Sequence, residues 1–453
     1  MGFSKDFVWG TATSAYQIEG GAKEDGKGEH IWQIYTAEKD GRVYGNQNGD
    51  TACDHYHRFR EDVQIMKELG AKAYRFSIDW SRILPEGIGN VNEKGIAFYN
   101  QLIDELLKAG IEPYITLYHW ELPYELYKKG GWMNEESAEW FGNYAKIVAQ
   151  RFSDRVTHYF TLNEPQCFVG LGYMTGEHAP GLHVPVRDTF LMAHNVLKAH
   201  GRAVQMLREY AKQPIQIGYA PTGSMNYPAT NKPEDIEAAR RSLFALPDTP
   251  RWTWNVAWWS DPVIFGAYPE EGLRKYERYL PKITDADMKL ISEPIDMLGA
   301  NIYNGNCVFM GEDGMPRIAA RAEGDPRTGN NWPIVPECLY WGPKFLYERY
   351  QKPLYITENG ISCRDIVSMD GKVHDPQRID FLCRYLQNLK KTVEDGADVR
   401  GYFLWSLLDN FEWNFGYSER FGIIHVDYQT QKRTWKDSAF WYRDVIKENG
   451  AAL

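Results

Sequence analysis

Short apolar runs rich in β-branched and aromatic residues alternate along the whole chain with segments in which apolar residues recur every three or four positions. The first kind of segment predicts buried β-strands, and the second predicts amphipathic helices. The pattern predicts eight strands, at residues 7–17, 71–78, 111–119, 155–164, 215–221, 296–303, 353–359 and 399–407.

Three of the predicted helices end on a glycine, the residue that most readily takes the left-handed conformation at a helix C-terminus. These glycines are Gly70, Gly110 and Gly396, and a predicted strand follows each of them within three residues. The order of strand, helix, glycine and strand predicts a parallel sheet, because parallel neighbours need a long crossover connection between them.

Eight such units without a break in composition predict an α/β protein built as a single (β/α)₈ barrel, or TIM barrel, over residues 1–453. A bare barrel needs about 250 residues, so long loops are expected at the C-terminal face of the strands. The alternative is an open doubly wound sheet, which would carry a glycine-rich phosphate turn, and no G-x-G-x-x-G or Walker pattern occurs. The long loops are predicted at residues 18–54, 165–190, 221–262 and 304–345.

Aromatic residues make up 14% of the chain, with 16 Trp and 29 Tyr. Aromatic rings fill protein cores, but they also stack on the C–H faces of sugars while offering an N–H or O–H group. Tryptophans next to polar strand ends are therefore the candidates for a binding role.

The formal net charge is −10, and acidic and basic residues are interspersed with no basic tract. This pattern argues against nucleic acid or an anionic membrane as a partner, since clustered lysines and arginines recognise both. The oligomeric state stays open, and a homo-oligomer is compatible with the sequence.

The cysteine pattern and the N-terminal residues predict a cytoplasmic location. The six cysteines are scattered without a C-x-x-C pair or zinc-like spacing, which predicts reduced thiols in a reducing compartment. Residues 1–17 contain no apolar signal core, and the chain has no run of eighteen apolar residues that could span a membrane.

Polar side chains gather at the C-terminal ends of the predicted strands, where the active sites of barrels of this class lie. Acids, amides and indoles are thus expected to converge on one mouth. In chain order, these residues are Gln17, Glu19, Arg75, His119, Trp120, Asn163, Glu164, Asn301, Tyr303, Glu358, Asn359, Trp405, Asp409, Glu412 and Trp413.

Glu164 and Glu358 stand out because each directly follows a predicted strand and neighbours an asparagine, in TLNEP and ITENG. They belong to the fourth and seventh predicted strands, on roughly opposite sides of an eight-stranded ring, so their carboxyl groups can face each other. Two facing carboxyls in different environments are what glycoside hydrolysis needs, one protonated and one ionised.

A metal site and a nucleophilic serine or cysteine are the competing chemistries. His55 and His57 open a predicted helix, and two histidines at this spacing point in different directions. His178 and His183 lie in a loop without identifiable partners. No G-x-S-x-G elbow occurs, and nothing marks a histidine partner for Cys167, which is interpreted as a buried structural thiol. No metal and no cofactor are expected.

Seven motifs occur in order along the chain: FVWGTATSAYQIEG, YRFSIDWSRILP, LYHWELP, YFTLNEP, YITENG, FLWSLLDNFEW and RFGIIHVDY. Together they resemble glycoside hydrolase family 1 β-glucosidases over nearly the whole chain. The resemblance implies a (β/α)₈ barrel, no cofactor, and hydrolysis of β-linked sugars with retention of anomeric configuration.

The resemblance also implies roles for the catalytic residues. Glu164, the acid of TLNEP, would be the general acid/base, and Glu358, the acid of ITENG, would be the nucleophile. Arg75 and Tyr303 would hold the nucleophile ionised and oriented, and Asn163 would bind the 2-hydroxyl of the sugar.

By the same resemblance, Gln17 would bind the 3- and 4-hydroxyls of the sugar, Glu412 would bind the 4- and 6-hydroxyls, and Trp405 would form the stacking floor. The remaining residues expected to contact the substrate are His119, Trp120, Asn301, Trp332, Trp413, Phe421 and Gln166.

The segment after Trp405 favours a neutral sugar over a sugar 6-phosphate. Relatives that hydrolyse 6-phospho-β-glucosides carry a serine, a lysine and a tyrosine there, whereas this chain reads NFGYSERFG, with Phe421 at the position of the tyrosine. The charge of Glu412 would also repel a phosphate.

Two departures from the family pattern bear on substrate preference. Many members have tryptophan after the NEP proline, lining the leaving-group side, and this chain has Gln166. Trp332 matches a tryptophan on that side. The strand-six segment reads ANIYNG, although the tyrosine that touches the nucleophile is retained as Tyr303.

The sequence therefore predicts a retaining β-glucosidase acting on cello-oligosaccharides and on aryl or alkyl β-glucosides, with β-galactosidase or β-fucosidase side activity. The partners expected are small-molecule β-glucosides. Two alternatives remain, a 6-phospho-β-glucosidase and a catalytically silent sugar-binding barrel.

Overall fold

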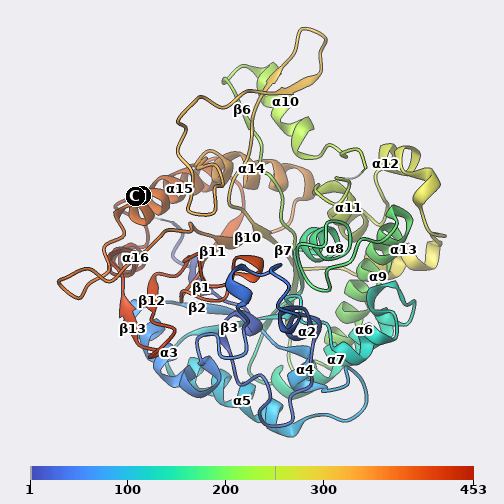
Figure 1. Ribbon diagram of the computed structural model, residues 1–453. Helices are drawn as coiled ribbons and strands as arrows, with labels where there is room; N and C mark the ends of the chain where they lie inside the picture. The colour runs from blue at the N-terminus through green and yellow to red at the C-terminus, as the bar shows by residue number, and fades with distance from the viewer. Residues whose placement is uncertain (1–2, 250) are drawn as a thin grey trace.

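The structure is a computed structural model that describes residues 3–249 and 251–453. In this part of the chain, eight parallel strands close into a barrel in the order β1-β11-β10-β7-β5-β4-β3-β2. Figure 1 shows the barrel at the centre of the molecule with helices around it. The strands are β1 (Val8–Ala12), β2 (Ala73–Ser77), β3 (Glu112–Tyr118), β4 (His158–Asn163), β5 (Gln216–Ala220), β7 (Met297–Asn301), β10 (Leu354–Asn359) and β11 (Val399–Trp405).

All eight predicted strands are confirmed, and with them the (β/α)₈ fold class. The largest difference in bounds is in the first strand, which was predicted to run to Gln17 but ends at Ala12. The chain then turns into the one-turn helix α1 (Ala15–Ile18), because the N–H of Ala15 donates to Ser77 Oγ at 2.7 Å instead of extending the ladder. Gln17 therefore lies on a helix turn after the strand.

Each barrel strand is followed by at least one helix before the next barrel strand, as the alternation predicted. The predicted stops Gly70, Gly110 and Gly396 take the left-handed conformation, with φ of 78°, 76° and 95°. The helices around the barrel are α3 (His55–Leu69), α5 (Glu93–Lys108), α7 (Ser137–Phe152), α9 (Val186–Tyr210), α13 (Asp285–Ile291), α14 (Cys338–Tyr350), α15 (Pro376–Glu394) and α16 (Asp437–Lys447).

The segments predicted as long loops contain short elements of their own, and α14 begins inside the last of them. Figure 1 shows β6 and α10 standing away from the barrel. The additional helices are α2 (Ile31–Ala37), α4 (Trp80–Ile83), α6 (Tyr124–Lys128), α8 (Pro165–Tyr173), α10 (Pro233–Leu243), α11 (Ala257–Phe265) and α12 (Glu270–Lys275), with 3₁₀ turns η1 (Tyr44–Asn46), η2 (Gly131–Met133), η3 (Glu277–Tyr279) and η4 (Trp413–Phe415). The additional strands are β6 (Tyr227–Pro228), β8 (Cys307–Met310), β9 (Pro316–Ile318), β12 (Ile424–Val426) and β13 (Arg433–Trp435). Among the described helices, none has the length and apolar character needed to cross a membrane.

Side chains of alternating size fill the barrel interior, so that the barrel is a packed core. Ala73, Phe160, Met297 and Phe403 belong to one buried interior cluster. Gly10 makes room for the ring of Phe403, because a Cβ at this position would lie 2.5 Å from a ring carbon. This packing forms a floor beneath the polar residues at the strand ends.

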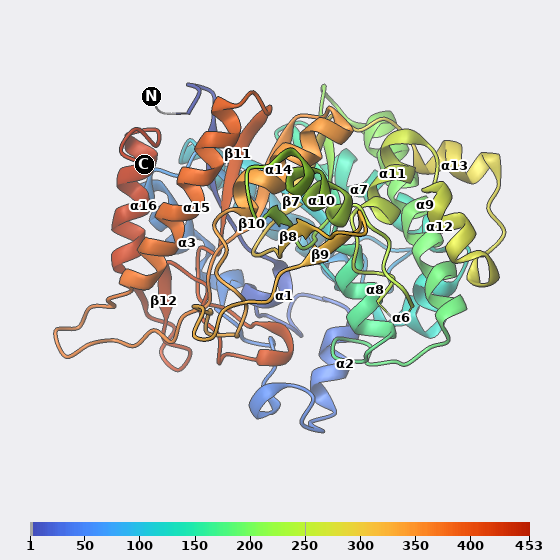
Figure 2. The same cartoon turned by 90° about the horizontal axis from the view of Figure 1, so that it is seen from above.

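The two ends of the described chain lie side by side at one edge of the molecule, near α16 (Figure 2). The N–H of Phe3 donates to the carbonyl oxygen of Asn449 at 3.1 Å, and Trp9 Nε1 donates to Asn449 Oδ1 at 2.9 Å. These bonds tie the segment before β1 to the turn after α16.

Candidate active site

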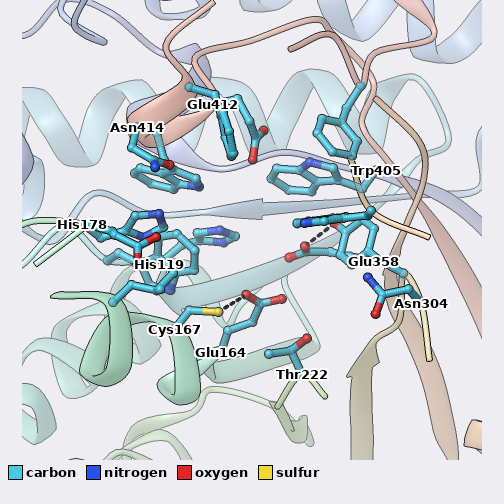
Figure 3. Close-up of a pocket in the computed structure, with 18 of the residues that line it drawn as sticks. His119, Glu164, Cys167, His178, Thr222, Asn304, Glu358, Trp405, Glu412 and Asn414 are labelled. Atoms are coloured by element: carbon cyan, nitrogen blue, oxygen red, sulfur yellow. Dashed lines mark hydrogen bonds between the residues drawn. The ribbon is translucent and has the colours of Figure 1, made fainter. Parts of the chain in front are cut away.

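A pocket of about 360 Å³, within the size range of small-molecule sites, opens at the C-terminal ends of the barrel strands. Figure 3 shows Glu164, Glu358 and Glu412 around the same space. The residues predicted from the sequence that line it are His119, Trp120, Glu164, Tyr303, Trp332, Glu358, Trp405, Glu412, Trp413 and Phe421. The predicted residues that lie behind this lining are Gln17, Arg75, Asn163, Asn301 and Gln166.

Register shifts in the barrel ladder aim two of the polar side chains inward. Phe160 and Tyr355 point into the barrel, so strict alternation along β4 and β10 would turn Asn163 and Glu358 outward. The pairing of β4 with β5 shifts between Phe160 and Asn163, and the pairing of β10 with β7 shifts just before Glu358. Irregularities of this kind re-aim the side chains that follow, and here they bring both residues to the pocket end of the barrel.

Three residues of the pocket wall have a left-handed backbone, which costs a residue other than glycine roughly 1–3 kcal/mol. Trp120, Glu164 and Trp413 have φ of 97°, 46° and 51°. Glu164 lies at the junction of β4 and α8, and Pro165 is the first residue of α8, where a missing N–H removes no helical hydrogen bond. The junction thus holds the Glu164 carboxyl at the tip of the strand.

Arg75, only 1% exposed, connects Glu358 to Asn163. Its Nη1 donates to Glu358 Oε1 at 2.7 Å, and its Nη2 donates to Asn163 Oδ1 at 2.6 Å. The hydroxyl of Tyr303 donates to the other oxygen of Glu358, Oε2, at 2.8 Å. Both oxygens of Glu358 therefore accept a hydrogen bond, and one of the donors is a buried cation that favours the ionised carboxylate.

Asn301 extends this network to the second carboxyl. Its Nδ2 donates to Glu164 Oε1 at 2.8 Å and to Asn163 Oδ1 at 3.0 Å. The hydroxyl of Thr357 donates to Asn301 Oδ1 at 2.6 Å, which fixes the orientation of the amide. Buried groups from β2, β4, β7 and β10 thus hold the two carboxyls in one connected arrangement.

The two carboxyls differ in how firmly they hold a proton. Burial raises the pKa of Glu164, and repulsion from Glu358 raises it further, to about 7. Burial also raises the pKa of Glu358, but the Arg75 guanidinium and the Tyr303 hydroxyl act in the opposite direction. Because the cation bonds to Glu358, Glu164 is the carboxyl that retains the proton near neutral pH.

Aromatic rings form much of the remaining wall. The rings of His119 and Trp405 lie nearly parallel, with centroids 5.7 Å apart, and those of Trp120 and Trp413 are 4.5 Å apart. Burial holds the pKa of His119 well below its ordinary value, so the ring is neutral. Its Nε2 accepts from Asn163 Nδ2 at 3.1 Å, which leaves a proton on Nδ1 that has no partner among the described residues.

Gln17 lies behind Glu412. Its Nε2 donates to the carbonyl oxygen of Phe411 at 2.9 Å and approaches Glu412 Oε2 at 3.4 Å. Burial and the neighbouring carboxylates raise the pKa of Glu412 to about 8. Glu412 is therefore largely protonated at neutral pH. Its negative charge then repels a sugar phosphate less strongly than the sequence analysis assumed.

Trp332 and Phe421 form an aromatic side of the pocket next to the nucleophile. The ring of Trp332 lies 5.2 Å from that of Tyr303 and 6.1 Å from that of Phe421. Both therefore lie within reach of a ligand placed against Glu358.

Contrary to the prediction, Gln166 does not line the pocket. Its side chain is fully buried, and its Nε2 donates to the carbonyl oxygens of Thr222 at 2.9 Å and Asn255 at 3.2 Å. These bonds fasten the segment after β5, whose Thr222 and Trp254 do line the pocket. Because the side-chain amide of Gln166 is hydrogen-bonded to the backbone of that segment, Gln166 positions the pocket wall. The neighbouring residues are then the ones placed to contact the substrate.

Several pocket residues were not assigned from the sequence, and Cys167 is the most closely connected to the carboxyls. It is buried, as expected, but its Sγ lies 3.0 Å from Glu164 Oε2. The sequence signal that could have predicted this contact is the three-residue spacing between Glu164 and Cys167, because residues three apart at the start of a helix lie on the same side of it. Loops after the strands contribute further pocket residues that were not assigned to the substrate: Glu177, His178, Trp254, Asn414 and Phe415.

Two of the histidines weighed as metal ligands, His55 and His57, have separate partners. His55 Nδ1 lies 2.7 Å from Asp62 Oδ2 in the interior, whereas His57 bonds to Asp54 and Glu24 at the surface. Over residues 3–249 and 251–453, no three histidine, cysteine or acidic side chains are grouped so that they could hold a metal ion.

The arrangement combines a proton-bearing carboxyl, an ionised carboxyl fixed by a cation, and aromatic walls with unpartnered polar groups. These are the parts required for glycoside hydrolysis by two carboxyl groups, in which one donates a proton and the other attacks the sugar.

Comparison with known proteins agrees with this chemistry. The sequence profile of Glycosyl hydrolase family 1 matches residues 1–451. Beta-glucosidase A of Thermotoga maritima is 45% identical over 99% of this chain and 98% of that protein, and Beta-glucosidase A of Acetivibrio thermocellus is 44% identical over 99% of each. The solved structure of the beta-glucosidase from Thermotoga maritima in complex with glucoimidazole superposes with a TM-score of 0.90 and covers 99% of both chains. The chain therefore belongs to glycosyl hydrolase family 1.

Proposed function

We propose that this protein is a retaining β-glucosidase that removes terminal non-reducing β-D-glucosyl residues from cello-oligosaccharides and from aryl or alkyl β-glucosides. The observation that carries the proposal is the pair Glu164 and Glu358, two buried carboxyls in one pocket whose partners give them opposite protonation states. The names of the Thermotoga maritima and Acetivibrio thermocellus relatives, both beta-glucosidases, support the same activity.

In the first step, Glu358 attacks the anomeric carbon of the bound glucoside. The bond from that carbon to the leaving oxygen breaks, and the proton on Glu164 passes to this oxygen. The Arg75 guanidinium and the Tyr303 hydroxyl keep Glu358 ionised and oriented for the attack. The product of this step is a glucosyl ester on Glu358.

In the second step, water replaces the alcohol that has left. Esterification removes the negative charge of Glu358, so the repulsion that raised the pKa of Glu164 disappears. Glu164 is then ionised and takes a proton from water, whose oxygen attacks the anomeric carbon and releases Glu358. Two displacements at the same carbon restore the β configuration.

Recognition of the sugar falls to the polar and aromatic side chains around the two carboxyls. His119 lines the pocket with a neutral ring whose N–H suits a sugar hydroxyl, and Trp405 beside it offers a flat face for stacking. Glu412 and Gln17 would bind the hydroxyls on the 3, 4 and 6 positions. A pocket that reads the 4- and 6-positions through side chains that can both donate and accept is compatible with side activity on β-galactosides and β-fucosides.

The lining of the pocket favours a neutral sugar over a sugar 6-phosphate. The described residues that line it include four glutamates and neither lysine nor arginine. Two cations that follow Trp405 are engaged elsewhere, since Arg420 bonds to Asp409 at 2.6 Å and Lys436 bonds to the same side chain at 2.7 Å. A phosphate dianion would therefore enter the pocket without a counter-charge.

Initial rates on 4-nitrophenyl β-D-glucoside and on its 6-phosphate test this assignment. We expect kcat/KM to be at least about 100-fold higher for the neutral glucoside, because a buried phosphate without a cation costs several kcal/mol. A preference for the 6-phosphate would overturn the substrate assignment and leave the two-carboxyl chemistry in place.

A further inference from the structure

Cys167 contacts the carboxyl of Glu164, and the reaction described above assigns no role to this contact. It is the third residue of α8, and its Sγ lies 3.0 Å from Glu164 Oε2 (Figure 3). Cys167 is 8% exposed and Glu164 is 7% exposed, so both groups are largely withdrawn from solvent. The contact therefore replaces water as a partner of this carboxyl oxygen.

The thiol is the donor in this contact. Burial raises the pKa of Cys167 well above its ordinary value, and the neighbouring Glu164 carboxylate raises it further. The S–H group is therefore protonated throughout the neutral range and can give its hydrogen to an ionised carboxylate. A protonated thiol in this setting is a poor nucleophile, which leaves hydrogen bonding as its contribution.

We propose that Cys167 is a positioning residue that fixes the Glu164 carboxyl and favours its ionised form through the S–H hydrogen bond. The proposal rests on the function proposed above, in which Glu164 must give up its proton in the first step and act as a base in the second. Asn301 donates to Oε1 and Cys167 donates to Oε2, so each oxygen has one fixed donor. A carboxyl held on both oxygens stays in one rotamer while its protonation state changes.

Other charged and titratable groups also face Glu164, and a test must leave them in place. They come from four different elements: Arg75 on β2, Tyr303 after β7, Glu358 on β10 and Glu412 after β11. Glu358 disfavours the ionised form of Glu164, whereas Arg75, Asn301 and Cys167 favour it. Replacing Cys167 changes one of these groups and none of the others.

The test compares Cys167→Val, which removes the donor, with Cys167→Ser, which keeps a hydroxyl donor of similar size. The readout is kcat/KM against pH on an aryl β-glucoside, whose basic limb reports the acid in the free enzyme. Without the S–H donor the ionised form of Glu164 is less favoured, so its pKa rises and the basic limb moves to higher pH. We expect a shift of about half a pH unit for Cys167→Val, in line with a weak hydrogen bond to a charged group.

Cys167→Ser should keep the basic limb at the wild-type position. Cys338→Val is the matched control, because Cys338 is likewise a buried cysteine but does not line the pocket. The basic limb of this variant should stay at the wild-type position. Should Cys167→Val fail to fold, Cys167→Ala removes the same donor with less bulk and should shift the limb in the same direction.

An unchanged basic limb in a folded variant without the donor would overturn the proposal, and so would an equal shift in Cys167→Ser and Cys167→Val. Absence of β-glucoside hydrolysis by the wild-type protein is a different result, since it would overturn the proposed function. A merely structural role for Cys167 would lower stability or kcat without moving the limb.

Discussion

Replacement of Glu358 by glutamine should reduce hydrolysis of aryl β-glucosides on the order of 10⁵-fold, as expected when a covalent nucleophile is removed. The amide has nearly the same shape, and its single carbonyl oxygen can still accept a hydrogen bond from Arg75 or from Tyr303, but it cannot form the glucosyl ester. Initial rates on 4-nitrophenyl β-D-glucoside, with circular dichroism to check the fold, measure the effect.

The substitution also breaks a buried ion pair, so loss of activity must be separated from loss of stability. Glu19→Gln is a matched control, because Glu19 Oε2 accepts from Arg82 Nε at 2.9 Å in another buried pair, outside the pocket lining. We expect the control to lose stability while keeping most of its turnover. Turnover of Glu358→Gln within about tenfold of wild type would contradict the nucleophile assignment. Absence of turnover by the wild-type protein would instead favour the silent sugar-binding barrel.

Replacement of Glu164 by alanine should affect substrates according to how much their leaving group needs a proton. Cellobiose and alkyl β-glucosides should lose about 10²–10⁴-fold in kcat/KM, the range for removal of a general acid. The 2,4-dinitrophenolate of a 2,4-dinitrophenyl glucoside is a stable anion that can leave without being protonated. The kcat/KM for this substrate should therefore change little. Its kcat should fall, because the second step has lost its base, and the glucosyl ester on Glu358 should accumulate.

The pH dependence of Glu164→Ala gives an independent check. In the wild type, the basic limb of kcat/KM follows loss of the Glu164 proton, whose pKa is about 7. The variant has no such proton to lose, so that limb should flatten. Equal losses on the dinitrophenyl and alkyl substrates, or a basic limb that persists unchanged, would count against Glu164 as the acid.

The fold was predictable because each barrel strand is a short apolar run followed by a helix. Gly70, Gly110 and Gly396 marked three of the strand starts correctly, since each takes a backbone conformation that few other residues accept. The predicted first strand was too long because strand-like residues continue past Ala12, whereas the N–H of Ala15 donates to the side chain of Ser77 instead of extending the ladder. A bond between residues 62 positions apart leaves no local signal in the sequence.

The site was predictable as a set of residues at strand ends, but its geometry was not. Alternation alone turns Asn163 and Glu358 away from the pocket, and only the register shifts seen in the pairing of β4 and β10 explain why they face inward. The left-handed backbone of Glu164 is likewise fixed by its surroundings. Resemblance to a family supplied these positions without supplying the physical reason for them.

Gln166 and Cys167 show that the sequence pattern does not tell which of two adjacent residues faces the pocket. The sequence argument placed Gln166 at the substrate and Cys167 in the core, whereas the structure turns the amide toward the backbone of Thr222 and Asn255 and the thiol toward Glu164. Both lie in the first turn of α8, where a rotation of about 100° per residue separates one environment from the next.

The stereochemistry of the first sugar released tests the central claim, double displacement at one carbon by Glu358 and Glu164. Proton NMR of an aryl β-glucoside digest, recorded within the first minutes, separates the two anomers of glucose before they interconvert. The account predicts that β-D-glucose appears first and that α-D-glucose follows only at the rate of spontaneous mutarotation. Release of α-D-glucose first would contradict it, because a single displacement by water inverts the anomeric carbon.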